Sequence, residues 1–260
     1  MNKYALLIGI NYINTSMKLD GAINDVKNIE NLIRNKFGYQ NIKLINDHSK
    51  RKPTKKVILE ELNKIINEIN CGNCDEFWFH YSGHGSNIPD YSGDEIDGRD
   101  EILIPIDYHK GNIISDDELY EILRKIKNKN CKIFCLIDCC HSGTQFDLPY
   151  LFTKRNKVIL NNNTDLECKV TLISGCSDKE VSYDVFNANG QNKASGAMTS
   201  SLISSLKALK FHCSFFDLIQ HMYNFLKKKQ YDQSPQLSSN YDINDGTMFC
   251  SKLNGKLCLM

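Results

Sequence analysis

The chain has 260 residues, of which 41% are hydrophobic and 24% are charged, and its formal net charge is +1. These proportions are typical of a globular protein, and the small net charge provides no field for binding nucleic acid or a membrane surface. No apolar run approaches the ~20 residues that a membrane-spanning helix requires. The N-terminus lacks the small-residue cleavage site of a secretory signal. The eleven cysteines, an odd number scattered through the chain, indicate reduced thiols and a cytoplasmic location.

Short apolar runs alternate with helix-like patterns along the chain. The apolar runs predict strands at 4–10, 42–45, 76–81, 132–137 and 170–174, with short strands at 236–239 and 248–250. Apolar positions at helical spacing, together with capping residues, predict helices at 21–36, 54–69, 115–127, 196–209 and 214–228. This alternation favours an α/β fold with a mostly parallel sheet and helices on both faces. The basic and asparagine-rich stretch 151–167 is predicted to be an exposed connection.

A thiol and an imidazole follow two of the predicted strands. Cys140 comes shortly after strand 132–137, and His84 comes after strand 76–81. Ligands bind at the carboxyl ends of strands in open α/β sheets, and a catalytic cysteine needs a neighbouring base. The backbone N–H groups of Gly85 and Cys140 are candidate donors to an oxyanion. Either residue alone is as readily explained as structural, so the inference depends on the pair.

Several motifs together identify a family. They include ALLIGINY at 5–12, HYSGHGS at 80–86, DGRDEILIPIDY at 97–108, LIDCCHSGT at 136–144 and ISGCSDKEVSYD at 173–184. With these motifs in family order over nearly its whole length, the chain resembles a metacaspase, a cysteine peptidase with the caspase fold. The resemblance implies a caspase-like three-layer sandwich with a mostly parallel central sheet. It also implies a catalytic dyad of His84 and Cys140, with Cys139 structural and His141 not the base.

The resemblance further implies an acidic pocket for Arg or Lys at the P1 position of the substrate. Asp25, Ser82 and Asp138 match the pocket positions. Carboxylates form charge-assisted, often bidentate bonds with a guanidinium, so the residue types suit this role. Read without the resemblance, Asp25 is better explained as a solvated acid in the first turn of a helix. One departure is Ala22, where some relatives carry a second cysteine.

Acidic residues gather around position 100, and calcium prefers six to eight oxygen ligands. The EF-hand pattern fails at Ile96 and Gly98, so any metal ligands must come from separate segments. The resemblance implies a calcium site, whose four candidate ligands are Asp100, Asp116, Asp117 and Asp147. Asp116 and Asp117 also suit the first turn of a capped helix, and Asp94 and Asp97 are expected in a solvated loop. A zinc site at Cys71 and Cys74 is not favoured, because no second cysteine pair follows at zinc spacing.

The expected organisation is a single catalytic domain over 1–260. Its large-subunit-like region covers about 1–150, the connection 151–167, and the small-subunit-like region 168–260. The short connection resembles type I metacaspases, although the chain begins at the first predicted strand with no N-terminal prodomain. Lys154, Arg155 and Lys157 lie in the connection, where an Arg/Lys-specific peptidase is expected to cut itself. The resemblance also implies a monomer.

The sequence therefore predicts a calcium-stimulated cysteine endopeptidase that acts on proteins or peptides. One alternative is a caspase that cleaves after Asp, but acids in the pocket would repel an acidic P1 side chain. Another is a non-catalytic or weakly catalytic scaffold that binds aggregates and retains the fold. Labelling of Cys140 by an alkylating inhibitor distinguishes the enzyme from the scaffold.

Overall fold

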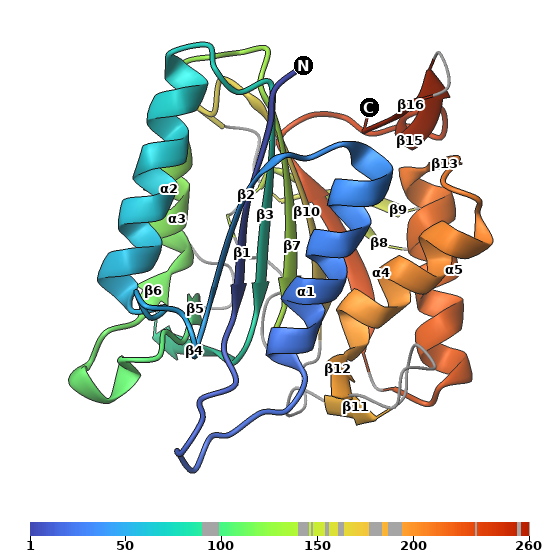
Figure 1. The fold of residues 1–260 in the computed structure, drawn as a ribbon. Helices are drawn as coiled ribbons and strands as arrows, with labels where there is room; N and C mark the ends of the chain where they lie inside the picture. The colour runs from blue at the N-terminus through green and yellow to red at the C-terminus, as the bar shows by residue number, and fades with distance from the viewer. Residues whose placement is uncertain are drawn as a thin grey trace.

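The computed structural model of the protein describes residues 1–89, 99–139, 146, 148–153, 156–160, 164–176, 184–186, 194–231, 233–253 and 256–259. Its centre is an eight-stranded sheet with the order β2-β1-β3-β7-β10-β14-β8-β9 (Figure 1). The strands of this sheet are β1 (Lys3–Gly9), β2 (Asn41–Asn46), β3 (Glu76–Ser82), β7 (Lys132–Asp138), β8 (Tyr150–Thr153), β9 (Asn156–Ile159), β10 (Lys169–Cys176) and β14 (Ser234–Ser239). The first five strands in this order are parallel, and β14, β8 and β9 continue it by antiparallel pairing. The predicted α/β fold with a mostly parallel sheet is confirmed.

Helices cover both faces of the sheet (Figure 1). On one face lie α2 (Lys55–Asn70) and α3 (Asp116–Leu123), and on the other lie α1 (Ala22–Leu32), α4 (Ala197–Ala208) and α5 (Phe215–Lys228). The central strands contribute alternate residues to two apolar cores. Phe77 and Phe79 of β3 belong to one core, while Trp78 belongs to the core beneath α1, α4 and α5. Because both faces are covered, β3 and β7 appear in the sequence as continuous apolar runs.

Three small sheets and two short helical turns complete the described structure. The small sheets are β4 (Gly85–Pro89) with β5 (Arg99–Leu103) and β6 (Ile114–Ser115), β11 (Asp184–Phe186) with β12 (Ala194–Gly196), and β13 (Cys213–Ser214) with β15 (Met248–Leu253) and β16 (Lys256–Leu259). A π-helix (Ile33–Phe37) extends α1, and a 3-10 helix covers Tyr108–Lys110. No helix in the described part of the chain is long and apolar enough to cross a membrane.

The helix boundaries follow local capping chemistry. Thr54 accepts a hydrogen bond from the backbone N–H of Val57 at 3.3 Å and caps α2. Ser115 and Glu118 form the predicted capping box at the start of α3. Gly38, with φ +74°, ends the extended α1 in the left-handed conformation that glycine adopts without strain. The α-helix α3 ends at Leu123, earlier than the predicted position 127.

Part of the predicted exposed connection forms regular structure. β8 and β9 form a hairpin that adds two strands to the central sheet beyond β14. Phe152 of β8 is 2% exposed, and its ring lies 5.7 Å from that of Phe216 on α5. This burial against α5 stabilises β8. The sequence did not predict this strand, because the surrounding lysines and asparagines are typical of an exposed connection.

A histidine is buried within the sheet. His80 of β3 is 0% exposed, and its Nδ1 lies 2.9 Å from the carbonyl oxygen of Leu136 on β7. Its Nε2 has no hydrogen-bond partner among the described residues. Burial lowers the pKa of His80 from 6.5 to about 4, because the charged imidazolium would lose its hydration. The imidazole is therefore neutral in the folded protein at pH 7.

Protonation of His80 is expected to destabilise the protein in mild acid. The folded pKa lies below the unfolded one, so the unfolded state takes up the proton first as the pH falls below 6.5, and stability decreases towards pH 4. Between about pH 7.5 and pH 5 this contribution is about 2 kcal/mol. Urea unfolding of the wild type and of His80→Gln at both pH values measures it. The decrease should shrink by that amount in the variant, and an equal decrease in both proteins would contradict the assignment.

Candidate active site

The carboxyl ends of three parallel strands bring the candidate site residues together. In the strand register, Ser82 of β3 pairs with both Gly9 of β1 and Asp138 of β7. The backbone N–H of Gly83 donates to the carbonyl of Asp138 at 3.3 Å, so β3 and β7 remain joined at their ends. This edge of the sheet carries polar side chains without interrupting the apolar interior, and ligands bind at such edges in open α/β sheets.

His84 is held by hydrogen bonds to its backbone and its ring. Its backbone N–H donates to the hydroxyl of Tyr12 at 3.0 Å, and its carbonyl accepts from the hydroxyl of Tyr81 at 2.8 Å. Its Nε2 lies 2.8 Å from the carbonyl oxygen of Met17. Because a carbonyl oxygen only accepts, Nε2 carries the proton, and Nδ1 of the neutral ring holds the lone pair. This tautomer is suited to proton abstraction at Nδ1.

The two tyrosines beneath His84 form a buried network that sequence reasoning missed. Their hydroxyl oxygens are 3.1 Å apart, and the Tyr12 hydroxyl donates to the carbonyl of Ile104 at 2.6 Å. Burial raises the pKa of both phenols, so they remain protonated hydrogen-bonding groups. Both tyrosines lie inside the motifs ALLIGINY and HYSGHGS, but a motif alone does not reveal that they support the histidine.

The candidate nucleophile Cys140 lies outside the described residues, as does His141. Its strand is described as far as Cys139, which is 2% exposed. Since Ser82 pairs with Asp138, His84 and Cys140 each follow the last paired residues of neighbouring strands by two positions. In sequence, the two members of the predicted dyad therefore directly follow the ends of adjacent strands. Gly85, the other candidate oxyanion donor, begins β4 and pairs with Leu103.

The three predicted pocket residues converge in the interior of this edge. Asp25, Ser82 and Asp138 are 0%, 3% and 7% exposed, and the Ser82 hydroxyl donates to Asp25 Oδ2 at 2.7 Å. Asp25 does lie in the first turn of α1, but its complete burial excludes the solvated-surface alternative. Burial raises the pKa of Asp25 well above its usual value, and the neighbouring Asp138 carboxylate raises it further.

The segment that leads into α4 supplies further donors, which sequence reasoning also missed. The hydroxyl of Ser195 donates to Asp25 Oδ1 at 2.5 Å, and the backbone N–H of Gly196 lies 2.9 Å from both Asp25 oxygens. The backbone N–H of Thr199 donates to Asp138 Oδ2 at 2.7 Å. Both carboxylates thus face the N-terminus of α4, where the helix dipole favours negative charge. A cationic ligand would relieve the remaining repulsion between them.

The candidate calcium ligands occupy two adjoining elements. Asp100 lies on β5, while Asp116 and Asp117 begin α3, directly after β6, which pairs with β5. Asp116 is 1% exposed, and its two oxygens accept the backbone N–H groups of Glu101 at 2.9 Å and Asp117 at 3.0 Å. Carboxylate oxygens are the donors that calcium prefers, so the chemistry of these residues suits the ion. Among the described residues no three such side chains converge on a metal position, and Asp147 lies outside them.

Of the three candidate self-cleavage residues, only Lys157 is described; Lys154 and Arg155 lie outside the described residues. Lys157 is on β9, and its Nζ lies 2.8 Å from a carboxylate oxygen of Asp242 and 4.5 Å from the ring centre of Tyr150. The acids Asp94 and Asp97 also lie outside the described residues.

Replacing Gly196 by alanine is expected to disrupt the carboxylate pair. A Cβ atom at this position would lie 2.3 Å from Asp138 Oδ2 and 2.8 Å from Asp25 Oδ2, so one element must move. We expect a loss of about 1–3 kcal/mol in the free energy of unfolding, measured by urea titration. Gly246→Ala is the matched control, because its Cβ would meet only Asn244 Oδ1 at 3.4 Å. Equal stability of the two variants would show that the packing around the carboxylate pair is more adaptable than its geometry indicates.

Comparison with known proteins identifies the family of the chain. The family model described as "Metacaspase, peptidase C14 domain" matches residues 3–149. Metacaspase-1 of Meyerozyma guilliermondii is 30% identical, and the alignment covers 92% of this chain and 70% of that protein. Metacaspase-1A of Aspergillus oryzae is 31% identical, with 93% and 68% covered.

Two solved structures share the fold. Protein GSU0716 from Geobacter sulfurreducens superimposes with a TM-score of 0.67 at 21% identity, covering 99% of this chain and 100% of that chain. Caspase-1 from Spodoptera frugiperda gives a TM-score of 0.57 at 10% identity, covering 92% of this chain and 85% of that chain. The three-layer sandwich is therefore that of the caspases, as expected. Together with the family match, this shows that the chain belongs to the metacaspases, cysteine peptidases that hydrolyse proteins.

Proposed function

We propose that this metacaspase is a calcium-stimulated endopeptidase that cleaves proteins after Arg or Lys with a dyad of Cys140 and His84. The observation that carries the specificity is the buried pair Asp25 and Asp138. Asp138 ends β7 beside the end of β3, and Asp25 of α1 accepts a hydrogen bond from Ser82 at that end of β3, two residues before His84. Two neighbouring buried carboxylates favour a cation, and the planar guanidinium of arginine suits them best.

In the proposed reaction, Nδ1 of His84 accepts the thiol proton of Cys140. The thiolate attacks the carbonyl carbon after P1, and the backbone N–H groups of Gly85 and Cys140 stabilise the oxyanion. The imidazolium then protonates the leaving amine, which departs as the new N-terminus and leaves an acyl-enzyme. His84 next takes a proton from water, whose oxygen attacks the thioester and releases the carboxylic acid and the thiol. The Met17 carbonyl keeps the ring in the required tautomer throughout.

Selectivity for a basic P1 residue follows from charge. An aspartate side chain brought between Asp25 and Asp138 would add a third negative charge to a buried site, whereas Arg or Lys would neutralise it. Asp25 already accepts hydrogen bonds from Ser82, Ser195 and Gly196, so its carboxylate is fixed in place before substrate binds. This rigidity reduces the entropy that binding must remove.

Substitution of Asp25 is expected to separate binding from stability. In Asp25→Asn, kcat/KM for a fluorogenic Arg peptide should fall by about 100-fold or more, because the buried charge partner of the guanidinium is lost. The melting temperature should change by only a few degrees, because relief of the repulsion with Asp138 offsets the loss of one acceptor oxygen for the hydroxyl of Ser82 or Ser195. Asp20→Asn, at an exposed carboxylate just before α1, is the control and should retain activity.

The same assay tests the alternatives. Preference of the wild type for an Asp peptide over the Arg peptide would indicate caspase-type specificity. Absence of both cleavage and labelling of Cys140 by an alkylating inhibitor, in the presence of calcium, would indicate a scaffold that retains the fold without turnover.

Calcium is assigned to the acidic residues Asp100, Asp116, Asp117 and Asp147. The proposal is supported by the burial of two described carboxylates on adjoining elements, with Asp100 8% and Asp116 1% exposed. Calcium supplies positive charge that offsets their repulsion when it is bound. In sequence, Asp147 lies seven positions after Cys140, so its carboxylate would connect the acidic residues to the catalytic segment.

Calcium binding is expected to stabilise the protein independently of its activity. In the Cys140→Ala variant, saturating calcium should raise the melting temperature by about 5 °C, and Asp100→Asn should abolish the shift. Asp245→Asn, which changes an exposed carboxylate outside the proposed site, should retain the shift. An unchanged melting temperature in the presence of calcium would exclude this calcium site.

Wild type incubated with calcium should also be cut after Lys154, Arg155 or Lys157, and mass spectrometry of the fragments identifies the cuts. Identical fragments from Cys140→Ala would show that another protease makes these cuts.

We further propose that the protein is a monomer in a reducing, cytoplasmic environment. The hairpin β8–β9 pairs with β14, so β14 is an interior strand of the sheet and offers no free edge to a second copy. The described cysteines are free thiols, most of them buried. Light scattering that reports a stable dimer would contradict the proposed monomer.

A further inference from the structure

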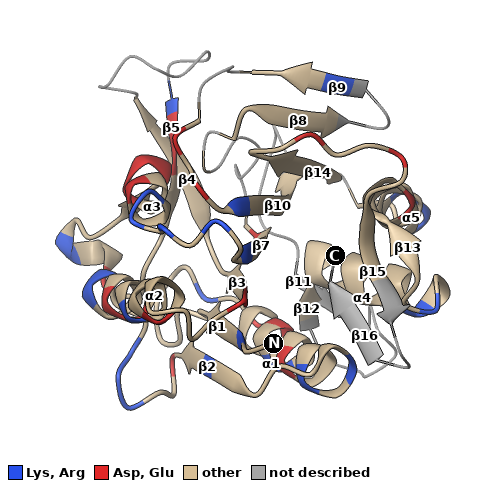
Figure 2. Cartoon of the chain, turned by 90° about the horizontal axis from the view of Figure 1, so that it is seen from above, with Lys and Arg blue, Asp and Glu red and all other residues tan. Residues whose placement is uncertain are grey.

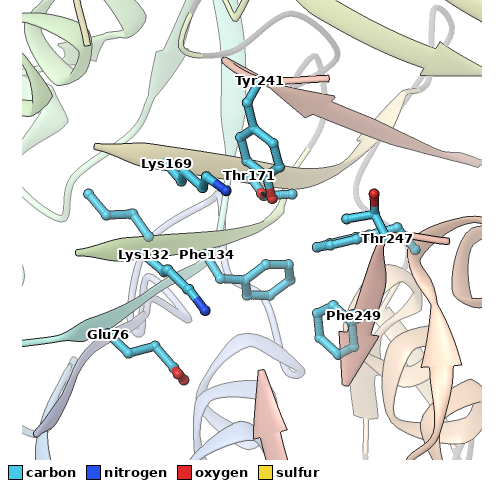
Figure 3. A pocket seen from close by; sticks show the side chains of 10 residues that line it. Glu76, Lys132, Phe134, Lys169, Thr171, Tyr241, Thr247 and Phe249 are labelled. Atoms are coloured by element: carbon cyan, nitrogen blue, oxygen red, sulfur yellow. Dashed lines mark hydrogen bonds between the residues drawn. The ribbon is translucent and has the colours of Figure 1, made fainter. Parts of the chain in front are cut away.

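A second cavity lies at the opposite edge of the sheet from the peptidase site. It is formed at the amino ends of β3, β7 and β10 together with β15, and its volume is about 110 Å³ (Figure 3). The residues that line it are Glu76, Lys132, Ile133, Phe134, Lys169, Thr171, Phe215, Tyr241, Thr247 and Phe249. None of them belongs to the proposed dyad, pocket or calcium site.

Charged residues form a row along this edge. Lys3, Glu76, Lys132 and Lys169 are cross-strand neighbours on β1, β3, β7 and β10. Figure 2, which views the molecule from above, shows basic positions on β7 and β10 and an acidic one on β3. Parallel strands that start in register bring these side chains to a single edge. The row contains three cations and one anion.

The negative charge of Glu76, the single acid in the row, is offset by its own partners. The Nζ atom of Lys3 lies 3.3 Å from both carboxylate oxygens of Glu76, and the Tyr39 hydroxyl donates to Glu76 Oε1 at 2.5 Å. Lys132 also points towards Glu76 in Figure 3. Within the described parts of the chain, no carboxylate forms an ion pair with Lys132 or Lys169. The two lysines therefore leave the mouth of the cavity with an excess of positive charge.

The interior of the cavity is aromatic. The ring of Phe249 lies 5.2 Å from that of Phe134 and 5.4 Å from that of Phe215, and all three side chains are at most 5% exposed. The hydroxyls of Thr171 and Tyr241 lie 2.8 Å apart and bond to each other. The walls therefore suit an apolar group, while the strongest attraction for a polar group is at the mouth, where Lys169 Nζ lies 5.1 Å from the Tyr241 ring centre.

We propose that this cavity binds a small monocarboxylate whose apolar body is about the size of one aromatic ring. The body would pack against Phe134, Phe215 and Phe249, with the carboxylate between Lys132 and Lys169. The volume limits the ligand, because about 110 Å³ is less than the ~150 Å³ cavity that encloses benzene and far less than the roughly 300–1,000 Å³ of pockets for larger ligands. The apolar body can therefore be no larger than one ring, with the edge that carries the carboxylate left at the mouth of the cavity. Peptides and nucleotides are therefore excluded from the interior. The proposal is independent of the peptidase specificity.

Binding of benzoate to the full-length protein tests the proposal. The only tryptophan, Trp78, has its ring 4.5 Å from that of Phe134, so its fluorescence reports on changes at the cavity wall. In the presence of a calcium chelator, which limits self-cleavage, benzoate should give a saturable change with a Kd of about 1 mM. Benzamide, which has the same shape without the charge, should bind at least about tenfold more weakly.

Substitution of the two lysines tests whether they attract the carboxylate of the ligand. The double variant Lys132→Gln, Lys169→Gln should weaken benzoate binding about tenfold, while Lys110→Gln, Lys125→Gln removes two lysines outside the cavity and should leave it unchanged. The comparison of benzoate with benzamide uses only the wild type, so it tests the need for a negative charge on the ligand even where a variant fails to fold. Equal affinity for benzoate and benzamide, no saturation below about 50 mM, or unaltered binding in the cavity variant would each overturn the proposal.

Discussion

The burial of two neighbouring carboxylates is the constraint around which the candidate active site is arranged. Asp25 comes from α1 and Asp138 from the end of β7, and each would be costly to bury without compensating hydrogen bonds. Ser82, Ser195 and the N-terminus of α4 provide them. Because these donors come from different elements, the packing of α1, the sheet and α4 is tied to one electrostatic requirement.

The histidine is positioned by a different kind of support. Two buried phenols and a backbone carbonyl hold His84, none of which carries a charge. These neutral hydrogen bonds fix the orientation and the tautomer of the ring. That suits the role proposed for His84, which is to accept a proton and then release it. Among the described residues, the buried negative charge is thus concentrated at Asp25 and Asp138, whereas neutral groups hold His84.

Ionisable side chains lie at both ends of the parallel strands for the same physical reason. β3 and β7 are covered on both faces, so their interior positions are mainly apolar, and an exception such as His80 stays neutral. Ionisable side chains are therefore found at the strand ends. At the carboxyl ends they are mainly acidic around Asp25 and Asp138. At the amino ends Lys132 and Lys169 give the excess positive charge beside the second cavity.

Local features of the structure were predictable from the sequence, because their causes are local. The capping box of Ser115 and Glu118, the helix stop at Gly38 and the continuous apolar runs each depend on residues only a few positions apart. The motifs were also sufficient to identify the family and to nominate Asp25, Ser82 and Asp138 as neighbours. The burial of Phe152 depends on α5, more than sixty residues away in the chain, so the hairpin β8–β9 was read as an exposed connection.

By itself, the sequence determined the fold class, the family and the residue types of the candidate site. Only the tertiary structure decided that Asp25 is buried rather than solvated, and that Ser195, Gly196 and Thr199 hold the two carboxylates. It also revealed the Met17 carbonyl beside His84. A backbone carbonyl has no signature in a sequence, since every residue carries one. Burial likewise depends on distant segments that meet only when the chain folds.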